Sequence, residues 1–225
     1  MSRRTQRVQD AVGYLLHSAA WRETSLIIQV FTRPYGNVAL VAKGAKRPYS
    51  ALRPVLTAFQ PLGLAWSGAG EVKTLTRAEC AGIRPLHGRA LMSAWYMNEL
   101  LLRLLPREDP HPVLYDAYDA ALRQLAVAFP GGRPEDAAAG AEGAAAPVQA
   151  PQGAGGLTPG SAASALRRFE WVLLNETGYG LEEDPPDFAD PRLEPGLRLS
   201  LRERLNEQLG RPLLTRKVLM ELQRY

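Results

Sequence analysis

The sequence of 225 residues contains a single cysteine, Cys80, and only three histidines, which are far apart. One thiol can form neither an internal disulfide nor a cysteine-rich zinc site, so nothing in the composition indicates an oxidising compartment. No apolar run approaches the roughly 18 residues that span a bilayer, and the N-terminus lacks the apolar core of a signal peptide. We therefore expect a cytoplasmic protein without a membrane segment.

Catalytic motifs are also missing. No glycine has the Gly-Lys-Ser/Thr continuation of a phosphate-binding loop, and no Gly-x-Ser-x-Gly elbow occurs. The histidines lack metal-ligand spacing. An acidic run formed by Asp184, Asp187 and Asp190 could hold a divalent cation weakly, although a solvated loop is the commoner explanation of a charge run. We expect no enzyme, no cofactor and no bound metal.

Positive charge is concentrated in one part of the chain. The first 80 residues hold eleven Lys/Arg against four Asp/Glu, whereas the whole chain has a net charge of +4, so the remainder is negative. A positive field confined to one segment attracts polyanions by releasing their counterions, while an evenly mixed surface would serve solubility alone. The N-terminal third is therefore the segment expected to bind a polyanion.

The first 82 residues have the pattern of a small β-barrel. Five strand-like runs, separated by Gly- and Pro-containing turns, cover residues 13–18, 24–32, 37–43, 59–67 and 71–79. Closure into a barrel would protect the edges that a lone sheet leaves open. In the last run, alternation places Lys73, Leu75, Arg77 and Glu79 on one face, with the two cations about 13 Å apart along the strand.

The rest of the chain is predicted to be helical, which makes the fold class α+β. Helical patterns cover residues 88–105, 111–129, 163–180, 200–210 and 215–222. Ser200 and Glu203 form a capping-box pattern at the fourth of these, after an acidic stretch, 181–199, that we expect to be irregular.

Residues 131–160 differ in kind, because Gly, Ala and Pro fill 21 of these 30 positions. Such a segment cannot offset its ordering entropy, so we predict a flexible linker. The expected organisation is a barrel domain, the first part of a helical domain, the linker, and the second part of the helical domain. Their predicted bounds are 1–82, 83–130, 131–160 and 161–225.

Binding chemistry is the kind that the barrel segment could supply. Small basic barrels bind single strands by contacting phosphates with Lys/Arg and stacking bases on aromatic rings. Trp21, Tyr35, Tyr49 and Trp66 are the aromatic candidates, although Trp66 ends an alternating strand and fits a core position better. A solvated loop remains the alternative for the basic residues. The candidate DNA-binding cations are Arg22, Arg33, Lys43, Lys46, Arg47, Arg53, Lys73 and Arg77.

Several motifs resemble the RecO family of bacterial recombination mediators. They are "RETSL", "VAKGAKR", "GEVKTL", "LRRFE" with "GYG", and "LGRPLLTRKVL", in that order. The resemblance implies an N-terminal oligonucleotide-binding (OB) barrel, binding of single- and double-stranded DNA, and annealing of complementary strands. It also implies contact with the C-terminal tail of single-stranded-DNA-binding protein (SSB), and work with RecR, and in many bacteria RecF, to load the recombinase RecA.

The implied SSB tail is acidic and ends in an apolar residue with a free carboxylate, so its receptor needs an apolar pocket rimmed by cations. Surface solubilisation is the alternative explanation for consecutive arginines on a helix. The candidate tail-binding residues are Leu166, Arg167, Arg168, Phe169, Arg216 and Lys217.

The chain departs from the family pattern in its second half. Many members have a four-cysteine zinc site, which a chain with Cys80 alone cannot build. The stretch between "GYGL" and "LGRPL" is short for the family, and residues 131–160 resemble an insertion. The rival hypothesis is a protein–protein adaptor whose basic barrel docks an acidic protein.

Overall fold

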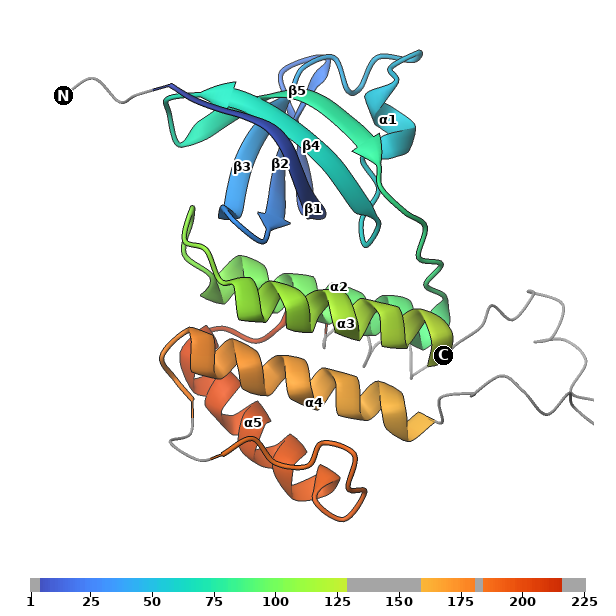
Figure 1. Ribbon diagram of the computed structural model, residues 1–225, viewed down its shortest axis with the longest axis vertical. Coiled ribbons are helices and arrows are strands. Elements are labelled where there is room, and N and C mark those ends of the chain that lie inside the picture. The colour runs from blue at the N-terminus through green and yellow to red at the C-terminus, as the bar shows by residue number, and fades with distance from the viewer. Residues whose placement is uncertain (1–4, 129–158, 181–183, 216–225) are drawn as a thin grey trace, which may run out of the picture.

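Five strands near the N-terminus close into a barrel (Figure 1). The structure, a computed structural model, describes residues 5–128, 159–180 and 184–215. Neighbouring strands follow the order β1-β2-β3-β5-β4, with β4 pairing back to β1 and only β3 and β5 parallel. This is an OB-fold barrel, which confirms the predicted α+β class with a five-stranded barrel. The strands are β1 (Gln6–Trp21), β2 (Ser25–Thr32), β3 (Gly36–Ala42), β4 (Pro61–Gly68) and β5 (Val72–Cys80).

The barrel interior is filled by alternate side chains of its strands, as the two-residue period of a strand requires. Trp66 is completely buried there, with the ring of Tyr35 edge-on at a centroid distance of 5.2 Å. Both rings therefore contribute to packing. The other buried members of this core include Leu15, Ile28, Val30, Leu40, Leu64 and Leu75.

Strand β1 is longer than its sequence pattern predicts and contains a bulge. Leu15 pairs with Val30 and His17 with Gln29, so Leu16 has no partner in the β1–β2 ladder. The carbonyl of Leu16 instead accepts a hydrogen bond of 3.0 Å from the amide of Asn98. A bulge re-aims the neighbouring side chains, and here it joins the barrel to a helix.

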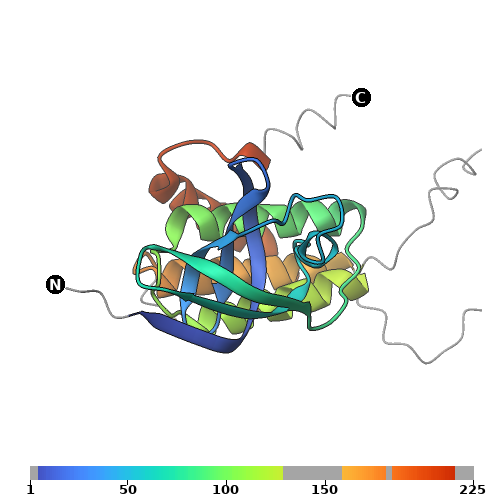
Figure 2. The same cartoon turned by 90° about the horizontal axis from the view of Figure 1, so that it is seen from above.

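Four longer helices form two layers below the barrel (Figures 1 and 2). The first layer, α2 and α3, lies against the barrel, and α4 and α5 lie beyond it. A one-turn helix, α1, follows the loop after β3. The helices are α1 (Leu52–Val55), α2 (Gly88–Leu104), α3 (Pro112–Ala128), α4 (Pro159–Glu176) and α5 (Glu194–Leu209).

Helix α5 begins earlier than the sequence pattern predicts. It begins at Glu194, with Pro195 in its first turn, so the irregular stretch ends there and Ser200 lies inside the helix rather than at its start. Proline is favoured in the first turn and an acid there complements the helix dipole, and these signals were stronger than the Ser200 capping pattern. Within the described residues, no helix has the length and apolarity that crossing a membrane requires.

The helical core continues onto the outer surface of the barrel. Tyr14, Leu16 and Phe31 belong to the same buried cluster as the apolar faces of α2 and α3. At its margin, Asp119 accepts hydrogen bonds from Tyr14 and from Arg84, the latter at 2.5 Å. These contacts occupy the side of the barrel that faces the helices.

Some predictions lie outside the described residues. Nearly all of the predicted linker, 131–160, and the helix predicted after Thr215 belong to this group, together with Arg216 and Lys217. The domain bounds stay predictions.

Candidate nucleic-acid interface and helical pocket

Two loops meet at the end of the barrel remote from α2 and α3 (Figure 1). One is the turn between β1 and β2; the other follows β3 and leads into α1. The amide of Lys46 donates a hydrogen bond of 2.9 Å to the carbonyl of Thr24, which ties them together. Gly44 adopts φ 71°, a left-handed conformation that glycine takes without strain, and so lets the second loop turn back.

The loops enclose a hollow of about 700 Å³. Three cations line it: Arg22 from the first loop, and Lys43 and Arg47 from the second, with Glu23 as the single acid. An adjoining hollow of about 480 Å³ is lined by Lys43, Arg47 and Tyr49. We call Arg22, Lys43, Lys46 and Arg47 the basic cluster.

The basic cluster is flanked by exposed aromatic rings. Tyr49 is fully exposed and Trp21 is 43% exposed, with the guanidinium of Arg22 5.8 Å from the centre of the Trp21 ring. Among the described residues, no carboxylate forms a salt bridge with the cluster. Cations without a carboxylate partner, beside exposed aromatic rings, can bind an anion that also carries flat rings.

Lys73 does not join the basic cluster. It shares a buried face with Leu75 and is only 4% exposed. A register shift in the β4–β5 pairing skips Thr76, and Arg77 and Glu79 are exposed, so the predicted alternation does not continue past Leu75. The loop after α2 covers the Lys73 side chain, because Glu108 donates its amide to the carbonyl of Asn37 and pairs its carboxylate with Lys73. The expectation that Lys73 presents its charge to solvent is therefore wrong, and the reason is a contact 35 residues away.

Three other candidates are also separate from the cluster. Arg33 forms a two-point ion pair with Asp116 of α3, at 2.9 and 3.0 Å. Arg77 donates to the carbonyl of Gln9 at 3.2 Å and lies 3.7 Å from Glu79. Arg53 is exposed on α1, next along the chain from the cluster.

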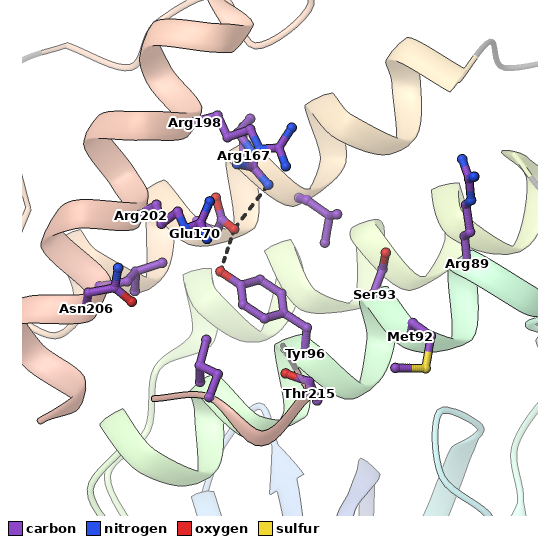
Figure 3. Close-up of a pocket in the computed structure, with 13 residues that line it drawn as sticks. Arg89, Met92, Ser93, Tyr96, Arg167, Glu170, Arg198, Arg202, Asn206 and Thr215 are labelled. Carbon is purple, nitrogen blue, oxygen red and sulfur yellow. Dashed lines mark hydrogen bonds and ion pairs between the residues drawn. The ribbon is translucent and has the colours of Figure 1, made fainter. Parts of the chain in front are cut away.

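A second site is a pocket of about 480 Å³ between α2, α4 and α5 (Figure 3). Its lining combines apolar side chains with four arginines. Leu166 and Arg167 line it, as the sequence predicted. Phe169 is completely buried in the helical core, and the exposed Arg168 is not among the lining residues. The other lining residues that the argument uses are Arg89, Met92, Tyr96, Glu170, Arg198, Arg202, Leu205 and Leu213.

One acid lies among these arginines. Glu170 is 3% exposed, accepts a hydrogen bond of 2.7 Å from the Tyr96 hydroxyl, and forms an ion pair of 3.2 Å with Arg167. Burial raises the pKa of the Glu170 carboxyl, although Arg167 and the Tyr96 hydrogen bond oppose this. Burial and the nearby acid likewise raise the pKa of Tyr96.

Glu99 holds the last described segment against the pocket. Its carboxylate accepts hydrogen bonds from the amides of Leu214 and Thr215, at 2.8 and 2.9 Å, and from the Thr215 hydroxyl at 2.8 Å. Burial alone would raise the pKa of Glu99, but these donors and Arg103 lower it. An ionised Glu99 thus fixes Leu213 and Thr215 as one wall of the pocket.

Two family models match this chain. Residues 8–84 match "Recombination protein O N terminal" and residues 86–137 match "Recombination protein O C terminal". The chain is also 49% identical over 191 residues to DNA repair protein RecO of Aromatoleum aromaticum, covering 84% of this chain and 66% of that protein. Proteins of the same name from Cupriavidus pinatubonensis and Azoarcus sp. are 47% and 48% identical, covering 87% and 79% of this chain. The chain belongs to the RecO family.

This RecO chain spans only part of the length of its curated relatives, namely 66% of the first and 57% and 60% of the other two. The N-terminal family model contains the whole basic cluster. The C-terminal model ends at residue 137, so the pocket residues on α4 and α5 lie beyond it.

The pocket contains functional candidates that sequence reasoning missed. Arg198 and Arg202 are four residues apart on α5, a spacing that puts them on one face of a helix. This signal was hidden because residues before 200 were expected to be irregular. Arg89 is far away in the sequence, and no local pattern connects it with α5. Within the described residues, no group of three or more His, Cys, Asp or Glu side chains could hold a metal ion.

Proposed function

We propose that this RecO chain acts in DNA repair as a non-enzymatic, DNA-binding mediator. The observation that carries the proposal is the basic cluster, in which two loops bring four cations to one end of the barrel. Among the described residues these cations have no carboxylate partner, and they lie beside the exposed rings of Trp21 and Tyr49. DNA is the polyanion that the names of its relatives indicate. Both single and double strands offer phosphates, and a single strand also offers its bases.

Charge neutralisation explains strand annealing without covalent chemistry. Lysine and arginine of the cluster contact phosphates and release counterions, so two bound strands repel each other less. Stacking on Trp21 or Tyr49 occupies the faces of bases and leaves their hydrogen-bonding edges free. A complementary strand can then pair while the first is still held. Arg53, exposed on the helix that follows, extends this contact.

The helical pocket is the proposed receptor for the SSB tail. A peptide that is acidic and ends in an apolar residue would place that residue against Leu166, Leu205 and Leu213 and its free carboxylate among the arginines. Four arginines against one buried acid make the pocket electropositive. Holding SSB this way would bring the barrel to SSB-coated DNA, where RecR, with RecF and RecA acting indirectly, would complete recombinase loading.

A strand-annealing assay tests the mediator proposal. Complementary oligonucleotides coated with SSB should anneal faster with this protein than without it, and the affinity for a single strand should fall as salt rises. A log–log salt slope of zero would contradict phosphate binding. Because an adaptor for an acidic protein would also respond to salt, a long single-stranded homopolymer serves as competitor: it should displace the labelled oligonucleotide, whereas a protein-docking site would ignore it.

A further inference from the structure

The acid within the helical pocket has an unusual environment (Figure 3). Both known contacts of Glu170, to the Tyr96 hydroxyl and to Arg167, use the same oxygen, Oε1. Its other oxygen, Oε2, is buried without a hydrogen-bond partner in the described part of the chain, and so is Nε of Arg167, one turn away on the same helix. Buried polar atoms are nearly always paired in folded proteins, so these two atoms require an explanation.

Charges on α4 and α5 and the Tyr96 hydroxyl of α2 surround Glu170. Burial favours its neutral form, Arg167 and Arg198 favour the charged form, and Glu194 favours the neutral form again. Burial is the largest of these effects, so the pKa of the Glu170 carboxyl is raised and its neutral form is easier to reach than that of an exposed glutamate. The charged and titratable groups around it are Tyr96 on α2, Arg167 on α4, and Glu194, Arg198 and Arg202 on α5, whereas Arg89 of α2 lines the far end of the pocket (Figure 3).

We propose that Glu170 makes carboxylate binding in this pocket depend on pH, because it competes with an incoming carboxylate for Arg167 and the carboxylate therefore binds together with a proton. The inference rests on the function proposed above for the pocket and adds how pH regulates that site. Two carboxylates beside one arginine in a water-poor site repel each other, and such pairs hold a shared proton.

The proton comes from solvent and goes to Oε2 of Glu170. Glu170 then no longer neutralises Arg167, whose guanidinium, including its unpartnered Nε, becomes available to the ligand carboxylate. Once protonated, Oε2 can donate a hydrogen bond, and the carboxylate of the ligand can accept that bond. Both unpartnered atoms thereby gain partners in the bound state.

The sign of the pH effect follows from linkage. A bound carboxylate favours neutral Glu170 and raises its pKa, so the ligand must bind more tightly where Glu170 is already protonated. Affinity should rise as pH falls, by at most about tenfold per pH unit, because one proton is taken up. An anion site built from arginines alone would show no such dependence, because arginine stays charged over this range.

The test measures the affinity of a fluorescently labelled peptide, acidic and ending in an apolar residue with a free carboxylate, at about pH 8 and about pH 5.5, where carboxyl groups of peptides remain ionised. The full chain should bind it about three- to tenfold more tightly at the lower pH. Glu170→Gln, which keeps an acceptor for Tyr96, should bind with little pH dependence. Glu203→Gln, on the exposed face of α5, removes the same charge and should leave the dependence intact.

A second variant covers the case in which Glu170→Gln unfolds the protein. Tyr96→Phe removes a hydrogen bond that favours the charged form, so the pH at which binding strengthens should move upward. Equal affinity of the unmodified chain at both pH values, or an unchanged dependence in Glu170→Gln, would overturn the inference while leaving the pocket as a peptide receptor. Failure of the peptide to bind at either pH, or equal binding of its C-terminal amide, would overturn the receptor function itself and this inference with it.

Discussion

Replacing the three loop residues of the basic cluster should weaken DNA binding and make the remaining affinity less dependent on salt. Each lysine or arginine that neutralises a phosphate of a single strand contributes about 0.7 to the log–log slope of affinity against salt. Lys43, Lys46 and Arg47 lie in one exposed loop without a described carboxylate partner, so replacing all three with Ala should lower the slope by about 2. Between about 50 and 200 mM salt, the affinity loss should then be roughly 20-fold smaller than in the unmodified chain.

The assay is fluorescence anisotropy of a labelled single-stranded oligonucleotide at several salt concentrations. Arg33→Ala is the matched control. The Arg33 guanidinium is already neutralised by Asp116 in a two-point ion pair, so it should bind a phosphate more weakly than a cluster cation does. The slope of this variant should stay close to that of the unmodified chain. If Arg33→Ala flattened the slope by about 0.7, the share expected of one cluster cation, or if the triple variant kept its slope, the assignment of the cluster would be refuted.

Three further predictions concern single residues. Glu108→Ala should lower the free energy of unfolding by about 1–3 kcal/mol, because the buried Lys73 loses its counter-charge. The loss should be smaller than the ~3–5 kcal/mol for breaking a fully buried ion pair, because Glu108 is 43% exposed. Unfolding of this variant at the same urea concentration as the unmodified chain would contradict this. Asn98→Leu should lower the free energy of unfolding by about 2–4 kcal/mol, because it leaves the Leu16 carbonyl and the Tyr118 hydroxyl unpaired at the barrel–helix boundary. A urea midpoint equal to that of the unmodified chain would argue against this role of Asn98. Trp21 should be the tryptophan whose fluorescence a single strand quenches, so Trp21→Phe should remove most of the quenching, and an unchanged signal would exclude stacking there.

The barrel was predictable from the sequence because strand alternation and turn residues are local signals. Four of the five predicted runs agree with β2 to β5 to within about two residues. The exception is β1, which the sequence predicts only over residues 13–18. Its bulge at Leu16 is stabilised by Asn98, and no local pattern in β1 indicates that helix.

The helices, like the strands, were predicted well where local signals agree and poorly where they conflict. The bounds of α2 and α3 were predicted closely, because apolar residues at helical spacing end at clear stop signals. For α5 two local signals conflicted, and the sequence interpretation followed the capping pattern at Ser200. Choosing the later start concealed Arg198, which is one of the residues that line the pocket.

The sequence by itself determined where positive charge is concentrated and where most strands and helices lie, because composition and periodicity are properties of neighbouring positions. It could not determine which face of β5 becomes buried, since that depends on a loop that places Glu108 over Lys73. Nor could it join the turn at Arg22 to the loop at Lys43, or Arg89 to α5. Closure of the barrel and packing of distant helices made those contacts, and burial away from water then decided which charges remain free to bind.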